Sequence, residues 1–318
     1  MNTSRQLTHP LLTRSLLLLA TLLVADIAPA QRLVMPGDRI LQMFDLRMTR
    51  NEKMHGKQPM FGSTSDEAVT MLRSFIEPAL RKGDDIKAIG PHWIAVLADE
   101  QRIASVDRIF QAAKKHRNDL MTIEVRLLDF KKDVFQKVLA ESLVKVERGD
   151  VTTYESVIEK DEARAFAKRC LSTANKSLAA PKLSVMPLQQ ANVSMVKTVP
   201  YIKDFTVERS DTAVIADPVV GTTWEGHKAT MLATFLPDGR IGLSCEVQIQ
   251  ELHRPIPKAE ITVVKNSQPV TIQLPRTSGV KLANVAELSP GSLVVLATER
   301  RDGTFIVAVV RATATGNR

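Results

Sequence analysis

Residues 241–250 read IGLSCEVQIQ, and every second side chain in this run is apolar. Strict alternation over ten residues predicts a β-strand with one apolar and one polar face. The pattern suits a soluble sandwich, where the apolar face meets a core, and also a membrane barrel, where it meets lipid. The apolar set is Ile241, Leu243, Cys245, Val247 and Ile249, and the other set is Gly242, Ser244, Glu246, Gln248 and Gln250.

The same period of two extends over the C-terminal part of the chain. Pro237-Asp238-Gly239 predicts a turn directly before the long strand. A second turn at Asp302-Gly303 predicts a terminal hairpin of residues 293–298 and 305–310. Further alternating runs occupy residues 191–195, 230–235 and 270–274. We therefore expect residues 179–318 to form an antiparallel β-domain.

Upstream of this region, the apolar spacing becomes helical. Ser65 and Asp99 are suitable N-caps for two helices, and the second helix carries an apolar stripe and ends in basic residues. The stripe is Ile103, Val106, Ile109, Phe110 and Ala113. Strands are expected within residues 86–97, with a turn at Gly90-Pro91, and over 121–130. These elements predict a small α/β module over residues 63–130.

Two segments flank this module. Residues 31–62 are read as an N-terminal extension in which Ile40, Leu41, Phe44 and Met48 suggest a short amphipathic helix. Residues 131–178 are read as a helical connector with a supporting Glu141–Lys145 pair. Its two stripes are Val134, Phe135, Val138, Leu139 and Val146, and then Ala163, Phe166, Ala167, Cys170, Leu171 and Ala174. The predicted fold class is α+β.

The first 30 residues have the pattern of a signal peptide. Arg5 and Arg14 precede a short apolar run, Ser15–Ala25, and Ala28-Pro29-Ala30 offers a cleavage site. The run is shorter than the roughly 20 residues of a membrane-spanning helix, which argues against a retained anchor. We expect a mature chain that starts at Gln31 and is exported to the periplasm or the outer membrane.

Composition sets broad limits on function. Apolar residues make up 44% of the 318 residues, which is enough to bury a core. The formal net charge is +8, but the basic residues are scattered and aromatic residues are only 4%, so no nucleic-acid partner is expected. Cys170 and Cys245 could form a disulfide after export or could remain small core residues.

No motif predicts catalysis. Walker, dinucleotide-binding, zinc-protease and serine-hydrolase signatures are absent from the sequence. None of the histidines His55, His92, His116, His227 and His253 has a partner at metal-ligand spacing. We therefore predict no catalytic residue, no cofactor-binding residue, no metal site and no enzyme activity.

Several weak motifs, taken in order, resemble the secretin family of ring-forming channel subunits. They are Ala179-Ala180-Pro181-Lys182-Leu183-Ser184, Ala191–Met195, Val199-Pro200-Tyr201, Gly226–Phe235, Ile241–Gln250, Val280–Leu288 and Pro290–Leu296. Residues 92–98 and 103–112 are similar to the ring-building modules that precede the secretin domain. Met121–Asp129 looks like the first strand of that domain. The resemblance covers about residues 85–300.

Two departures qualify this resemblance. The interval Lys131–Leu178 reads as charged helix, where secretins place long amphipathic hairpins that form the channel wall. Pro187-Leu188-Gln189-Gln190 stands where an Asn-Gly turn is usual. The resemblance implies a homo-oligomeric ring in protein secretion across the outer membrane, with other secretion or envelope proteins as partners. The alternative is a monomeric soluble periplasmic binding or adaptor module with secretin topology.

Overall fold

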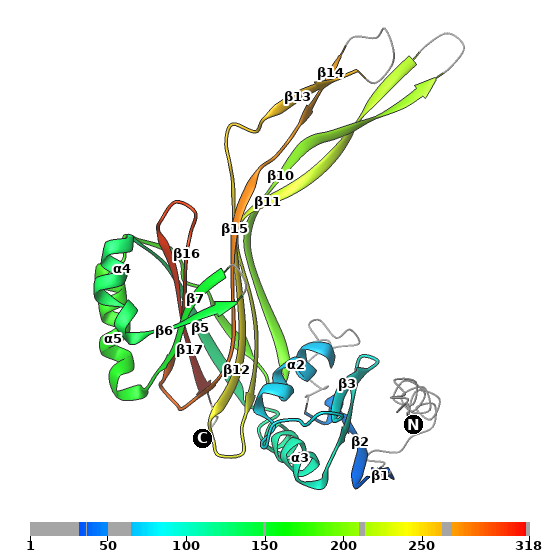
Figure 1. Cartoon of the computed structure of the whole chain (residues 1–318), viewed down its shortest axis with the longest axis vertical. Helices are drawn as coiled ribbons and strands as arrows, with labels where there is room; N and C mark the ends of the chain where they lie inside the picture. The colour runs from blue at the N-terminus through cyan, green and yellow to red at the C-terminus, as the bar shows by residue number, and fades with distance from the viewer. Residues whose placement is uncertain are drawn as a thin grey trace, which may run out of the picture. The chain divides into compact units, whose positions relative to one another are not determined.

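The computed structural model describes residues 32–35, 37–49, 65–148, 151–209, 214–262 and 269–315, and the chain divides into two compact units (Figure 1). Unit 1 is Met1–Arg117 and unit 2 is Asn118–Arg318. The expected signal peptide and its cleavage site lie outside the described residues. Within those residues, no helix has both the length and the apolar character needed to cross a membrane.

Unit 1 is a four-stranded antiparallel sheet with two helices. The strand order is β1-β2-β4-β3, and α3 packs on β2 and β4. Phe44 of β2 stacks on Phe110 of α3, with the ring centroids 4.8 Å apart. The elements are β1 (Arg32–Met35), β2 (Arg39–Asp45), the 3-10 helix η2 (Leu46–Thr49), α2 (Ser65–Phe75), β3 (Asp85–Ile89), β4 (Trp93–Ala98) and α3 (Glu100–Lys115).

The helix predicted around Ile40 and Phe44 is wrong, because this segment is strand β2. A spacing of four residues is even, so it suits one face of a strand as well as one face of a helix. Pairing with β4, from Ile40↔Ala98 to Asp45↔Trp93, selects the strand. The cap predicted at Asp99 is confirmed, because its Oδ1 accepts a hydrogen bond from the N–H of Arg102 at 3.0 Å.

Unit 2 has three layers: helices, a seven-stranded sheet and a four-stranded sheet (Figure 1). The seven-stranded sheet has the order β6-β7-β16-β17-β5-β8, with β9 also on β5, and the second sheet has the order β10-β11-β12-β15. Its elements are β5 (Leu120–Phe130), α4 (Lys132–Val138), η4 (Ala140–Ser142), β6 (Val144–Arg148), β7 (Val151–Ile158), α5 (Lys160–Thr173), β8 (Lys176–Ala179), β9 (Lys182–Val185), β10 (Gln189–Arg209), β11 (Val214–Phe235), β12 (Ile241–Leu252), β13 (Lys258–Ile261), β14 (Val270–Gln273), β15 (Thr277–Leu288), β16 (Leu293–Glu299) and β17 (Phe305–Thr315).

Two cores lie on opposite sides of the seven-stranded sheet. Between the sheets, the apolar face of β12 packs against residues such as Ile123 and Val125 of β5. Beneath the helices, Phe135 of α4 stacks on Phe305 of β17 at 3.9 Å between centroids. The strand predicted over 241–250 is thus confirmed, and its apolar face is buried in the protein core. The α+β fold class is also confirmed.

Residues 131–178 are not a purely helical connector. The hairpin β6–β7 separates α4 from α5 and joins the seven-stranded sheet through β16. Val146, predicted on a helical stripe, therefore lies on β6, and Lys145 pairs with Glu147 at 2.6 Å instead of Glu141. An isolated segment can show helical spacing, but pairing with β16 decides its structure.

Strand β5 lies in unit 2, whereas the sequence placed residues 121–130 in the α/β module. It pairs with β17 along its whole length, from Leu120↔Thr315 to Phe130↔Phe305. Cys170 and Cys245 are buried free thiols, and they belong to the two different cores. The disulfide that the sequence left open is therefore not formed.

Candidate assembly interface

The two edges of the four-stranded sheet are strands β10 and β15. In the described part of the chain, no further strand pairs with the outer side of either one. Exposed positions along these edges include Asn192 and Ser194 on β10 and Lys281 and Ala283 on β15. An edge strand presents backbone N–H and C=O groups that a strand from another chain can pair with.

Strands β10 and β11 extend far beyond this sheet as a two-stranded arm (Figure 1). β11 pairs with β10 from Val214 to Ala233, but with β12 only from Gly226 to Phe235. The 12 residues from Val214 to Glu225 correspond to about 40 Å of strand at ~3.4 Å per residue. The arm, defined here as residues 197–209 and 214–225, therefore lacks a β12 partner.

The arm exposes large apolar side chains. Val220 is 62% exposed and Ile215 is 54% exposed on β11, and Met195 at its base is 41% exposed on β10. A register shift between Ile202 and Asp204 marks a bulge in β10. Two-stranded ribbons are marginally stable in water on their own, so an arm of this length needs neighbours.

One neighbour within the chain is the short hairpin β13–β14. It pairs in register from Lys258↔Gln273 to Ile261↔Val270. Gln273 accepts a hydrogen bond from the backbone N–H of Ile202 at 2.9 Å, which attaches this hairpin to the outer edge of β10. This contact supports β10 near Ile202, within the arm.

The base of the arm is fixed by one glycine and several polar contacts. Gly226 has a φ of +127°, and a Cβ there would lie 2.3 Å from the carbonyl oxygen of Met195. Arg254 forms a bidentate ion pair with Glu225, in which both N–O distances are 2.9 Å. Gln250 donates to the carbonyl of Trp224 at 2.7 Å. These contacts hold β11 where it leaves the four-stranded sheet.

The outer face of the four-stranded sheet is polar. Thr230 donates to Asn192 at 2.8 Å, and Lys281 pairs with Glu246 at 2.9 Å. Burial raises the pKa of Glu246, but hydrogen bonds from Lys281 and Gln248 outweigh this effect and hold the pKa below its usual range. Cross-strand pairs of this kind stabilise neighbouring strands without a second apolar layer.

The described histidines occupy different positions in the two units. The backbone of His92 accepts from Leu46 N–H, and its buried Nδ1 has no hydrogen-bond partner among the described residues. His116 follows α3, and His253 lies beside Glu251 and Arg300 in a polar hollow of about 310 Å³. Burial lowers the pKa of His227. His55 lies outside the described residues, and those residues contain no His, Cys, Asp and Glu cluster that could hold a metal ion.

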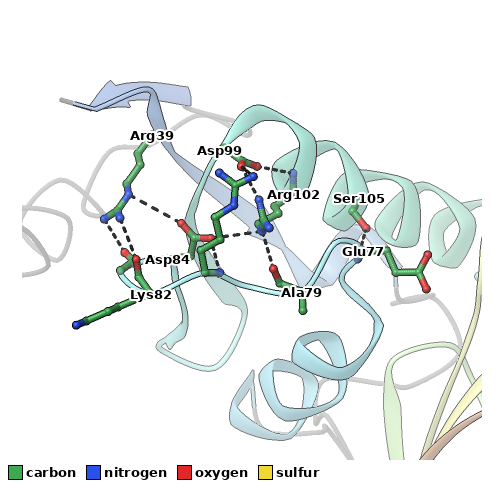
Figure 2. A network of polar contacts seen from close by, with 10 residues as sticks. Arg39, Glu77, Ala79, Lys82, Asp84, Asp99, Arg102 and Ser105 are labelled. Atoms are coloured by element: carbon green, nitrogen blue, oxygen red, sulfur yellow. Dashed lines mark hydrogen bonds and ion pairs between the residues drawn. The ribbon is translucent and has the colours of Figure 1, made fainter.

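A buried ion network lies in unit 1 (Figure 2). The Arg102 side chain is 4% exposed and contacts Asp84 at 3.4 Å, Asp99, and the carbonyl of Ala79 at 2.8 Å. Hydrogen bonding from the Arg102 backbone N–H holds the pKa of Asp99 below its usual range, against an opposing effect of burial. Arg39 also reaches this loop, through the carbonyls of Gly83 and Lys82. The network fixes the start of α3 against the loop before β3 and has the character of a structural site.

The arm is the feature that the sequence did not reveal. Alternation was recognised at 191–195 and 230–235, where one face meets the core, but not beyond. Pro200 and Pro218 lie within the arm and argue against a strand in the sequence, and neither face of the arm is continuously apolar. The arm could have been inferred from the length of chain between residues 195 and 230, which is too long for an ordinary turn.

No protein-family model matches this chain, and no curated protein matches it. Among solved structures, the secretin InvG of the Salmonella SPI-1 type III secretion injectisome aligns with a TM-score of 0.34 at 11% identity, over 90% of this chain and 89% of that chain. The type IV competence pilus secretin PilQ of V. cholerae aligns with a TM-score of 0.29 at 9% identity, over 96% and 82%. A chain of the ETEC pilotin–secretin complex AspS–GspD aligns with a TM-score of 0.29 at 10% identity, over 96% and 67%. Values this low assign neither a family nor a function to this chain.

Proposed function

We propose that this chain is an exported subunit of a secretin-like ring in the cell envelope, with a structural and transport role in protein secretion across the outer membrane. The observation that carries the proposal is the arm, a long two-stranded ribbon that continues from a sheet with two unpaired edges. The order of sequence motifs that resembles secretins supports the same function. The partners are other copies of this chain and further secretion or envelope proteins.

The number of strands favours a ring of repeated contacts. Strands β10, β11, β12 and β15 alternate in direction because every neighbouring pair is antiparallel. With an even number of strands, β15 of one copy and β10 of the next are also antiparallel, so the sheet can continue without a defect. Such a contact joins two different surfaces, and repeating it around an axis closes a ring.

Assembly would also stabilise the arm. In a continuous sheet, the arms of successive copies lie side by side, and the edge of β11 that extends beyond β12 gains a neighbour. Exposed apolar side chains such as Val220 and Ile215 would then be covered, which lowers the free energy of the assembled state. A single copy in water has no such cover over these described residues.

Disulfide trapping tests the proposed contact. Asn192 on β10 and Ala283 on β15 lie in the same row across the sheet. The row is defined by the register pairs Asn192↔Thr230, Thr230↔Glu246 and Glu246↔Ala283. We would combine Ala283→Cys with a cysteine at position 192, 194 or 196, because a ring can shift this register by an even number of residues. Oxidation of the matching double variant is expected to give a ladder of multimers on non-reducing gels.

The single variants are the decisive controls. In the proposed ring, Ala283→Cys or Ser194→Cys alone forms no disulfide between copies and runs as a monomer on the denaturing non-reducing gel, whereas a symmetric dimer would link two identical positions. Gln136→Cys, on the exposed side of α4, controls for random collision. Native thiols give little background, because burial raises the pKa of Cys170 and Cys245 to about 12. Dimers from a single variant, or a monomer by light scattering in both buffer and detergent, would contradict the ring and favour the periplasmic adaptor.

A further inference from the structure

A groove of about 920 Å³ runs between α5 and the helix-facing side of the seven-stranded sheet. Helices α4 and α5 cover the part of this side that holds Phe130 and Phe305, but the part near Arg126 and Arg311 is open. Its apolar floor is formed by Ala163, Ala167, Leu171, Leu293 and Val309. Because the side chains of Ala163 and Ala167 are small, they do not fill the space between α5 and the sheet. Leu171 is 43% exposed in this groove.

The rim of the groove is strongly basic. Lys160, Arg164 and Lys168 line one side from α5, and Arg126 and Arg311 line the other side from β5 and β17. Within the described residues, none of these five side chains has a carboxylate within ion-pair distance. The one acidic residue of the lining, Glu124, is paired with Lys182 at 3.1 Å.

The three α5 cations are spaced four residues apart on one face of the helix. Each step corresponds to about 6 Å along the helix axis. Carboxylates at positions i and i+4 of a second helix have the same spacing. The basic rim is complementary to acidic side chains, and the apolar floor is complementary to an apolar stripe. An acidic amphipathic helix offers both on opposite sides.

We propose that this groove binds an acidic amphipathic helix of a partner protein, which fills the vacant position in the helical layer. Its apolar stripe would cover Ala167 and the exposed Leu171, and its carboxylates would pair with the basic rim. The groove is concave and flanked by a helix and a sheet, which favours a helix over a flat anionic membrane surface. The proposal does not depend on ring formation.

A designed 16-residue peptide with Glu at successive i, i+4 positions and a Leu and Ala stripe is the probe. Fluorescence anisotropy of the labelled peptide would be measured against the full mature chain at low and at physiological salt. We expect saturable binding that weakens with salt, because rim charges are screened. A peptide with Lys in place of every Glu is expected not to bind.

Matched variants place the binding in the groove. Arg164→Glu with Lys168→Glu reverses two exposed rim charges and is expected to weaken binding by about tenfold or more. Leu171→Ser is expected to weaken it by several fold through the lost apolar contact. Lys131→Glu with Lys137→Glu makes the same charge change on α4, outside the groove lining, and is expected to leave affinity within about twofold. Circular dichroism checks that each variant is folded.

Three results would overturn the proposal. One is the absence of saturable binding of the Glu peptide, and another is equal loss of affinity in the groove and control variants. The third is sedimentation with anionic phospholipid vesicles that needs Arg164 and Lys168 while the peptide does not bind, which would assign the groove to lipid. Ring formation, tested by disulfide trapping, can succeed or fail separately from each of these results.

Discussion

Arg102 is a single residue on which the local structure of unit 1 depends. Replacing it with Met keeps much of its volume but removes the nearer of the two cations of Asp84, whose side chain is 5% exposed, and leaves it with Arg39 at 3.9 Å. Removing one member of a buried ion pair costs about 3–5 kcal/mol, so Arg102→Met should strongly destabilise unit 1. Urea unfolding followed by Trp93 fluorescence, in a Trp224→Phe background, measures this loss. Arg108→Met, at an exposed position of the same helix, should change stability by less than about 0.5 kcal/mol.

His227 should make the stability of unit 2 depend on pH. Burial lowers its pKa, nearby Lys176 adds to this effect, and Glu251 opposes it. The unfolded chain therefore takes up the proton before the folded chain does as the pH falls. The contribution of neutral His227 is complete above about pH 6.5 and declines as the pH falls toward the folded pKa. Urea midpoints read from Trp224 fluorescence between pH 7.5 and 5.5 should fall less steeply for His227→Gln than for the parent, and equal slopes would contradict this account.

At this scale, the sequence predicts local interactions and misses distant ones. The sequence predicts Asp99 as a helix cap because its carboxylate and the backbone N–H that donates to it, that of Arg102, are three residues apart. Arg102 was not recognised, because Asp84 and Ala79 lie 18 and 23 residues earlier in the chain. The basic rim of the groove was missed for the same reason, since Arg126 and Arg311 meet only across the pairing of β5 with β17.

Among the elements, strand β11 depends on Gly226 at the point where it leaves the sheet. Gly226→Ala would place a Cβ against the carbonyl oxygen of Met195 at a backbone φ that other residues rarely adopt. We expect a loss of about 1–3 kcal/mol in unit 2, read from Trp224 fluorescence during urea unfolding. Gly279→Ala on β15 has no positive φ and should cost less. Equal effects of the two substitutions would show that Gly226 is not a special position.

Strands and helices were predicted well where one face of an element is buried. α3, α5 and β12 each carry an apolar stripe that meets a core, and each was found at its expected place. The helix predicted in place of β6 is wrong, because Val146 continues the helical spacing of Val134 and Val138 by coincidence. Strand pairing with β16, which lies more than 130 residues later, supplies the information that this segment lacks.

For the whole molecule, the α+β class followed from the sequence, but the grouping of elements into units did not. Strand β5 follows α3 directly in the chain, so residues 63–130 looked like one module. In the structure, β5 is a central strand of the second unit and pairs with the C-terminal strand β17. Such pairing between distant segments leaves no periodic signal in either segment.

The arm offers a test of assembly at the level of the whole molecule. Met195 and His227 are a register pair, so residues 196–226 can be replaced by an Asn-Gly turn that closes a short hairpin. The two cores of unit 2 contain none of the deleted residues, so the shortened chain should stay folded and still unfold cooperatively in urea. Without the arm, the contact between copies should lose its exposed apolar residues and much of its strand length. We therefore expect light scattering in detergent to show monomers for the shortened chain and multimers for the parent, and multimers of equal size in both would place the contact elsewhere.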